Sequence, residues 1–312
     1  MNITIIGLGL IGGSIAIDLR KAGLASHLIG VDLNPIHAHR ALELGLVDEV
    51  QPEDKAIANA DLIVLAIPVN AMTALLPVIL DSLPDPARPA GGRQTGITEE
   101  TIVMDCGSTK IKVCQAVQHH PKRKQFVAAH PLAGTENSGP DAAFAGLFNG
   151  KTNIICERDL SSDKALETVT RIFDALGMTT IFMDTDEHDK HVAYVSHLSH
   201  VSSFLLGQTV LDIEKDEKNI FNLASSGFAS TVRLAKSSPD MWTPISEQNV
   251  EYLGQALLEY IMHLQKFHYH LMKHDTKELH RILTSANDIR RVLEGIELKK
   301  STVNGPQSID IL

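Results

Sequence analysis

The chain has 312 residues, of which 44% are hydrophobic and 21% are charged. This balance is typical of a globular protein and excludes a largely disordered chain. Acidic residues outnumber basic ones by 38 to 28, giving a formal net charge of −10, which argues against nucleic acid or an anionic membrane as a partner. The length suggests about two domains.

The cysteines and the apolar runs indicate the cellular compartment of the protein. The three cysteines, Cys106, Cys114 and Cys156, contain no CxxC motif, so we expect reduced thiols. The N-terminal MNITIIGLG runs directly into a predicted strand and shows no secretion signal. No stretch approaches the ~20 apolar residues that a membrane span needs. We therefore expect a cytoplasmic protein without a membrane partner.

Predicted strands and helices alternate through the first part of the chain. Short β-rich runs predict strands at 2–6, 27–32, 61–68, 101–106, 126–131, 152–156 and 179–183. Helical spacing predicts helices at 10–22, from Pro35 onward and at 163–176. This alternation predicts an α/β fold: a Rossmann-type, doubly wound, mostly parallel sheet with helices on both faces.

The pattern changes after about residue 184. Long amphipathic stretches at 187–212, 242–272 and 276–297 predict an all-α helical domain. We therefore expect a dinucleotide-binding domain at 1–183, a helical substrate-binding and dimerisation domain at 184–300, and a tail at 301–312.

Two surface features accompany this division. Apolar residues at helical spacing, namely Leu253, Leu257, Tyr260 and Leu264, favour a helix–helix homodimer, although a monomer core is the simpler alternative. The Pro- and Gly-rich residues 84–98 predict a surface loop.

A glycine motif, GLGLIG at 7–12, follows the first predicted strand and opens a helix. In that context Gly7 allows a tight turn, Gly9 lets the backbone approach a pyrophosphate, and Gly12 lets the helix pack on the strand. Asp32 ends the second strand, where a carboxylate binds the adenosine ribose hydroxyls and repels a 2′-phosphate, so NAD is favoured over NADP. The candidate cofactor-binding residues are Gly7, Leu8, Gly9, Ile11, Gly12, Asp32 and Pro68.

Further motifs lie at predicted strand ends and in the helical part: DCGSTK at 105–110, HPLAG at 130–134, HDKHVAYVSHLSH at 188–200 and TVRLAKSSPDMW at 231–242. With the glycine motif, this ordered set resembles the prephenate/arogenate dehydrogenases of tyrosine biosynthesis from residue 1 to about 290. The resemblance implies oxidative decarboxylation of prephenate to 4-hydroxyphenylpyruvate with hydride transfer to NAD. Arogenate is the alternative substrate.

The resemblance also implies roles for single residues. His130 is the expected catalytic base, and its imidazole suits proton transfer near neutral pH. Ser108 is expected to bind the substrate hydroxyl or hold His130, and it can equally cap the following helix. Arg233 is expected to bind a substrate carboxylate through its planar fork. His200, His197 and Trp242 are expected to line the substrate site, although polar contacts and core packing are alternatives for these three.

Other readings of the sequence carry less weight. We expect no metal site among His188, His191, His197 and His200. Asp189 is expected to lie near the start of a helix as a favourable N-terminal charge, or to act where the two domains meet. A β-hydroxyacid dehydrogenase would use a Lys and an Asn four residues apart, as Lys215 and Asn219 are, but these lie in a charged run. A non-catalytic NAD-binding sensor is a further alternative.

Overall fold

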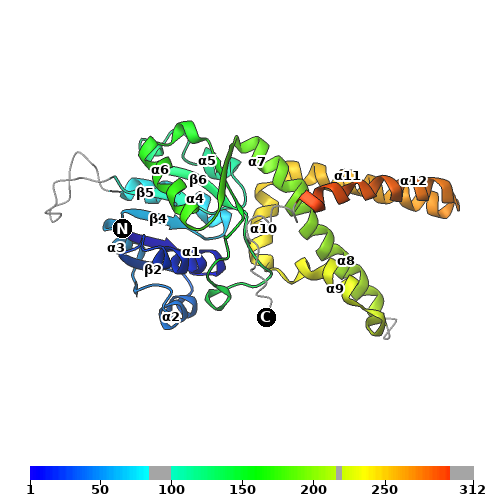
Figure 1. Cartoon of the computed structure of the whole chain (residues 1–312), viewed down its shortest axis with the longest axis horizontal. Coiled ribbons are helices and arrows are strands. Elements are labelled where there is room, and N and C mark those ends of the chain that lie inside the picture. Colours follow the sequence, from blue (N-terminus) through cyan, green and yellow to red (C-terminus); the bar gives the residue numbers. More distant parts are fainter. Residues whose placement is uncertain (84–99, 216–219, 296–312) are drawn as a thin grey trace, which may run out of the picture. The chain divides into compact units, whose positions relative to one another are not determined.

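Strands and helices alternate through the first part of the chain, as the sequence predicts (Figure 1). The computed structural model describes residues 1–83, 100–215 and 220–295. The predicted loop at 84–98 and the predicted tail at 301–312 lie outside the described residues.

Eight strands in the described part of the chain form one sheet. They are β1 (Asn2–Ile6), β2 (His27–Val31), β3 (Glu49–Val50), β4 (Leu62–Leu65), β5 (Ile102–Asp105), β6 (Phe126–Pro131), β7 (Thr152–Cys156) and β8 (Thr179–Met183). Their order is β3-β2-β1-β4-β5-β6-β7-β8, and every neighbouring pair is parallel except β6 with β7. The direction of winding reverses between β1 and β4, where the carboxyl ends of parallel strands frame a ligand-binding crevice.

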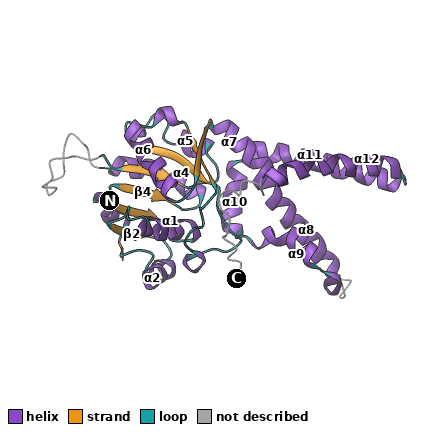
Figure 2. Ribbon diagram, in the orientation of Figure 1, coloured by secondary structure: helices purple, strands orange, loops and turns teal. Residues whose placement is uncertain are grey.

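Helices cover both faces of this sheet (Figure 2), so the predicted α/β fold class is confirmed. They are α1 (Leu10–Lys21), α2 (Pro35–Glu43), α3 (Glu53–Ala58), α4 (Val69–Ser82), α5 (Ile111–Gln115) and α6 (Asp163–Ala175). Buried residues of α1 and α6 belong to one core, and those of α3, α4 and α5 belong to the other. In β4, Val64 faces the first core and Ile63 the second, which explains why this strand is a continuous apolar run.

The part after residue 184 is helical, as predicted. Its helices are α7 (Thr185–Val192), α8 (Leu198–Glu214), α9 (Ser226–Val232), α10 (Pro239–Gln248), α11 (Val250–Met272) and α12 (Thr276–Ala286). None of the described helices is long and apolar enough to cross a membrane.

All three stretches predicted as continuous helices are interrupted, the last of them by a 3-10 turn at Asn287–Ile289. A π-helical turn, Ala193–His197, separates α7 from α8, and Asn249 separates α10 from α11. Apolar periodicity alone does not predict either of these two breaks. Both carry polar residues of the candidate site.

Internal contacts divide the chain into two compact units, Met1–Leu253 and Gly254–Leu312. The first unit contains the sheet together with α7 to α10, and the second contains α12 and most of α11. The domain boundary predicted between residues 183 and 184 lies where the secondary structure changes from mixed to helical. It stays a prediction. In α11, Leu257 is half-buried, whereas Tyr260 and Leu264 are 37% and 52% exposed.

Candidate active site

The turn between β1 and α1 is the dinucleotide loop (residues 7–12), and its backbone requires glycine at two positions. Gly7 has a φ of +98°, and a Cβ there would lie 2.3 Å from the carbonyl oxygen of Ala66. A Cβ on Gly12 would lie 2.0 Å from the carbonyl oxygen of Gly7. The turn and the close packing of α1 on β1 therefore have the geometry that a dinucleotide fingerprint predicts.

The same loop leaves room for a phosphate. A Cβ on Gly9 would approach no atom closer than the amide nitrogen of Gly139, at 4.0 Å. Gly9 is also the N-cap of α1, and no side chain caps that helix end. Backbone N–H groups in the first turn are thus free to bind an anion, which fits a pyrophosphate. The Leu8 side chain is buried and the Ile11 side chain is half-buried, so both help to anchor the loop by packing.

Asp32 follows β2 beside this loop. Its Oδ2 accepts a hydrogen bond from the Leu8 amide at 2.9 Å, and its Oδ1 accepts one from the Asn34 amide at 2.9 Å. Asn34, rather than Asp32, caps α2. Each carboxylate oxygen can accept a further bond, so Asp32 suits a pair of ribose hydroxyls. The neighbouring Leu33 is 98% exposed and offers an apolar surface to an adenine ring.

Two candidate residues lie just beyond the ends of neighbouring strands of the sheet. Pro68 is the exposed N-cap of α4, just beyond β4. Ser108 lies beyond β5 and is half-buried, and among the described residues it has no hydrogen-bond partner. Lys110 occupies the N-cap position of α5, so the alternative role of Ser108 as a helix cap is wrong. The Ser108 hydroxyl is free for a ligand.

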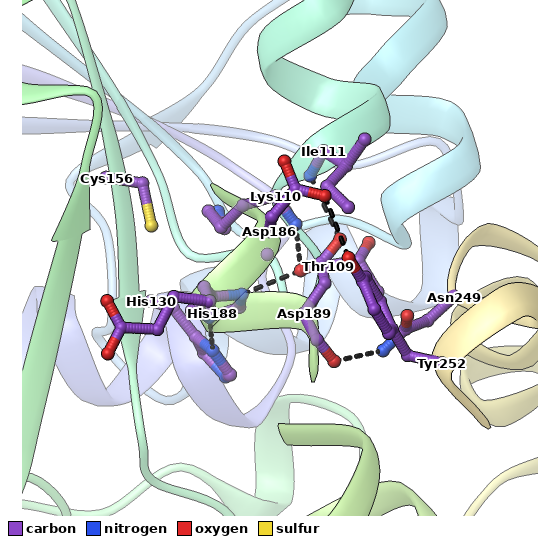
Figure 3. Close-up of polar contacts among 12 residues, drawn as sticks. Thr109, Lys110, Ile111, His130, Cys156, Asp186, His188, Asp189, Asn249 and Tyr252 are labelled. Carbon is purple, nitrogen blue, oxygen red and sulfur yellow. Dashed lines mark hydrogen bonds and ion pairs between the residues drawn. The ribbon is translucent and has the colours of Figure 1, made fainter. Parts of the chain in front are cut away.

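His130 lies in β6 and is only 8% exposed. Its Nδ1 is 2.8 Å from Nε2 of His188, and Nδ1 of His188 is 2.7 Å from Oδ1 of Asp189. Figure 3 shows these contacts as a continuous row of side chains. Burial lowers the pKa of His130 well below its usual value, and electrostatic repulsion from His188, Lys110 and His197 in their protonated forms lowers it further. The imidazole is therefore neutral at neutral pH and can accept a proton.

Asp189 does not have the position that the sequence predicts. Its own helix, α7, begins at Thr185 and is capped by Asp184, so Asp189 lies in the second turn. Its buried carboxylate instead accepts hydrogen bonds from the amides of Lys110 at 2.8 Å and Ile111 at 3.0 Å. Asp189 is thus an N-terminal charge for α5, a helix far away in the sequence, and the prediction for its own helix is wrong.

A buried ion pair holds the residue before His130. Asp105 and Lys110 pair with each other, and both side chains are fully buried. Asp105 accepts a hydrogen bond from the Ala129 amide at 3.0 Å, and Lys110 donates to the Ala129 carbonyl at 2.7 Å. The register of β5 with β6 ends at Val127, so these side chains replace the backbone bonds that the sheet lacks at Ala129. The backbone at His130 is therefore fixed on its β5 side.

His197, His200 and Trp242 pack against one another. His197 ends the π-helical turn, and its ring contacts Trp242 edge to face with centroids 5.8 Å apart. The His200 ring stacks on Trp242, with ring centroids 3.7 Å apart. Burial lowers the pKa of His197 to about 4. The indole Nε1 of Trp242 is buried and has no hydrogen-bond partner in the described part of the chain.

Arg233 begins a short 3-10 turn, Arg233–Lys236, after α9. Its Nη1 donates to Oε2 of Glu136 at 2.8 Å, which joins the helical part to the loop after His130. The Arg233 side chain is 51% exposed, and its remaining N–H groups can bind a second carboxylate. Burial and then the Arg233 charge lower the pKa of His200, so this guanidinium and the His200 ring lie within electrostatic range.

The structure brings most of the predicted substrate and catalytic residues together. We call His130, His188, His197 and His200, with Asp189 and Trp242, the histidine cluster. Sequence reasoning did not predict the supporting roles of His188, Asp189, Glu136 and Asn249, nor the buried ion pair of Asp105 with Lys110. Asn249 donates to the Asp189 carbonyl at 2.7 Å and lies 3.2 Å from Nδ1 of His197. No local sequence motif identifies Asn249. Glu136 could have been identified as a charged residue six positions after His130, in the loop that follows the strand.

Family comparisons cover nearly all of the chain. Residues 15–182 match the family described as "Prephenate dehydrogenase, nucleotide-binding domain", and residues 184–285 match "Prephenate dehydrogenase, dimerization domain". The prephenate dehydrogenase of Bacillus subtilis is 30% identical over 301 residues, which are 96% of this chain and 77% of the relative.

Two solved structures are similar over the same length. Prephenate dehydrogenase from A. aeolicus, in complex with hydroxyphenyl propionate and NAD+, matches with a TM-score of 0.79 and 28% identity, covering 94% of this chain and 98% of that one. Synechocystis arogenate dehydrogenase matches with a TM-score of 0.70 and 30% identity, covering 94% and 100%.

Proposed function

The chain belongs to the prephenate dehydrogenase family, and on that premise we propose that it oxidatively decarboxylates prephenate to 4-hydroxyphenylpyruvate in tyrosine biosynthesis, with NAD as cofactor. The observation that carries the proposal is the buried, neutral imidazole of His130 in β6, with the free Ser108 hydroxyl just after the neighbouring strand β5. The membership in this family also argues against a non-catalytic sensor and against a β-hydroxyacid dehydrogenase.

The proposed NAD site is the dinucleotide loop with Asp32. The free N–H groups of α1 hold the pyrophosphate, and Asp32 holds the adenosine ribose. Pro68 and Ser108 follow adjacent strands, β4 and β5, on the route to the nicotinamide end. When bound, NAD supplies the acceptor for the hydride.

The chain's own residues do the rest. Arg233 binds a carboxylate of the substrate, and Ser108 hydrogen-bonds the 4-hydroxyl. His130 accepts the hydroxyl proton at Nε2, because its Nδ1 is already engaged by His188. As the carbonyl forms, the ring carboxylate leaves as CO₂ and the ring becomes aromatic, which makes the reaction effectively irreversible. Burial of the histidine cluster keeps water away from this proton transfer.

The side-chain end of the site favours prephenate over arogenate. Prephenate offers a ketone, which needs donors, whereas arogenate carries an ammonium group, which needs acceptors. Arg233 and the unpaired Trp242 Nε1 are donors. Glu136, an acceptor in the loop after His130, is already bound to Arg233. The Synechocystis relative keeps arogenate as the second candidate.

An assay of all four substrate and cofactor pairs tests this proposal. Purified protein is given prephenate or arogenate with NAD or NADP, and reduced cofactor is measured. The highest kcat/KM is expected for prephenate with NAD. A higher kcat/KM for arogenate would identify arogenate as the substrate. No turnover with either prephenate or arogenate would contradict the proposed function.

The assembly is proposed as a homodimer through the helical part, in the cytoplasm. Residues 184–285 match a family described as a dimerization domain, and α11 exposes Leu258, Ile261, Met262 and Leu264. Such a row of apolar side chains is unusual for a surface that stays in water. Sedimentation equilibrium should give twice the chain mass of 34.0 kDa.

A further inference from the structure

We infer that His188 and Asp189 form a buried relay that fixes the tautomer of His130, with the proton on Nδ1 and the lone pair of Nε2 directed at the substrate hydroxyl. Both residues act on His130 as positioning residues. The inference rests on the proposed function for its catalytic meaning, whereas the tautomer itself is a property of the protein without substrate.

The direction of the relay is set at its far end. Asp189 is 1% exposed, and its carboxylate accepts the amide hydrogens of Lys110 and Ile111. An acceptor held in this way can only receive a hydrogen bond from His188, so Nδ1 of His188 carries a proton. Asn249 fixes the backbone of the same residue by donating to the Asp189 carbonyl at 2.7 Å.

The near end follows from the chemistry of imidazole. Burial lowers the pKa of His188, although Asp189 opposes that shift, so His188 is neutral and carries one ring proton. With that proton on Nδ1, its Nε2 is an acceptor. Nε2 lies 2.8 Å from Nδ1 of His130, which must then be the donor. A neutral His130 therefore has its lone pair on Nε2.

The groups around His130 also keep its ring neutral before it accepts a proton. Lys110, His188 and His197 each disfavour a positive charge on the ring. Lys110 is paired with Asp105 and bound to the Ala129 carbonyl, so this cation is fixed. When His130 accepts the substrate proton, its Nδ1–H keeps donating to His188, whose Nδ1–H keeps donating to Asp189. The developing charge is thus spread toward a carboxylate, and no proton has to leave His130 during the step.

Three variants on α7 separate this role from a structural one. His188→Leu removes both polar contacts, His188→Gln keeps a carboxamide oxygen that can accept from Nδ1 of His130, and His191→Leu is the matched control. The His191 side chain is 58% exposed on the same helix. Circular dichroism melts of all three variants report whether the fold is retained.

We expect His188→Leu to lower kcat for prephenate by about 100-fold, within the range of general-base catalysis. KM and the Kd for NAD should change less than about threefold, since His188 touches neither ligand. The loss should persist on the alkaline plateau of the kcat profile, because the choice between two neutral tautomers does not depend on pH. The kcat of His188→Gln should be about tenfold higher than the kcat of His188→Leu. A plateau kcat for His188→Leu within about threefold of the unsubstituted protein would overturn the inference.

Imidazole ¹⁵N shifts of the protein without substrate decide the tautomer directly. We expect a protonated Nδ1 and an unprotonated Nε2 on His130, and a mixture of tautomers in His188→Leu. A protonated Nε2 on His130 in the unsubstituted protein would overturn the relay. Absence of turnover with prephenate and arogenate would contradict the proposed function instead, and the nitrogen shifts would still test the tautomer.

Discussion

The dinucleotide loop and the histidine cluster are built in different ways. The loop is six consecutive residues whose shape follows from glycines that no other residue can replace, at Gly7 and Gly12. The cluster joins β6, α7, the π-helical turn, α8 and α10 through side-chain contacts between residues up to 58 positions apart. One region depends on backbone geometry and the other on buried hydrogen bonds.

This difference predicts how each region fails. A buried polar network loses much of its function when one member is removed, because its partners are left unsatisfied. A backbone cradle continues to bind its ligand when a distant side chain changes. Substitutions in the histidine cluster should therefore abolish turnover and leave NAD binding intact, and this separation can be tested from both sides.

The largest effect is expected for His130→Ala. Loss of the proton acceptor should lower kcat by about 1,000-fold, within the range of general-base catalysis. The Kd for NAD, measured by fluorescence or calorimetry, should change less than about threefold, because the dinucleotide loop is untouched. A tenfold or greater loss of NAD affinity would show that the two regions are not separable.

Acid should weaken the histidine cluster specifically. The pKa of His197 is lowered from 6.5 to about 4, so the unfolded chain binds a proton in this window and the folded protein does not. Stability should therefore fall as the pH decreases from about 6.5 to about 4, by roughly 3 kcal/mol from this residue. Urea unfolding across this range measures the loss, and His197→Gln should make the dependence less steep, while His130, His188 and His200, whose pKa values are also lowered, keep their share of it. An equally steep dependence in that variant would contradict the assignment.

Arg233→Ala tests the substrate-binding residue outside the histidine cluster. We expect KM for prephenate to rise by about 30-fold with less than about a threefold change in kcat, as for lost ground-state binding. Arg281→Ala is the matched control, since Arg281 also forms an ion pair with a glutamate, Glu278, at 2.7 Å. A large loss of kcat at constant KM would contradict the proposed role of Arg233.

Asp32→Ala tests the loop side and should have the smallest effect. The carboxylate holds the ribose and repels a 2′-phosphate, so its loss should weaken NAD and reduce the preference over NADP by about tenfold. The ratio of kcat/KM for the two cofactors measures this, and turnover at saturating NAD should be retained. An unchanged cofactor preference would count against Asp32 as the ribose-binding residue.

The sequence predicts the loop better than the cluster for the same physical reason. The requirement for Gly7 and Gly12 is local, and Asp32 follows at a spacing set by one strand–helix–strand unit. His130 and Arg233 were found through ordered motifs. The supporting contacts of Asp189 and Asn249 were not, because the partners of a buried polar group depend on how distant elements pack. Two of the breaks in the predicted helices, at the π-helical turn and at Asn249, occur where these contacts form.

The most direct test of the account is a crystal structure of the protein with NAD and 4-hydroxyphenylpyruvate. The account predicts that Nε2 of His130 lies within hydrogen-bond distance of the ring hydroxyl, with the guanidinium of Arg233 on the side-chain carboxylate and Nδ1 of His130 still bound to His188. A product hydroxyl facing another side chain, with His130 turned away from it, would contradict the central claim.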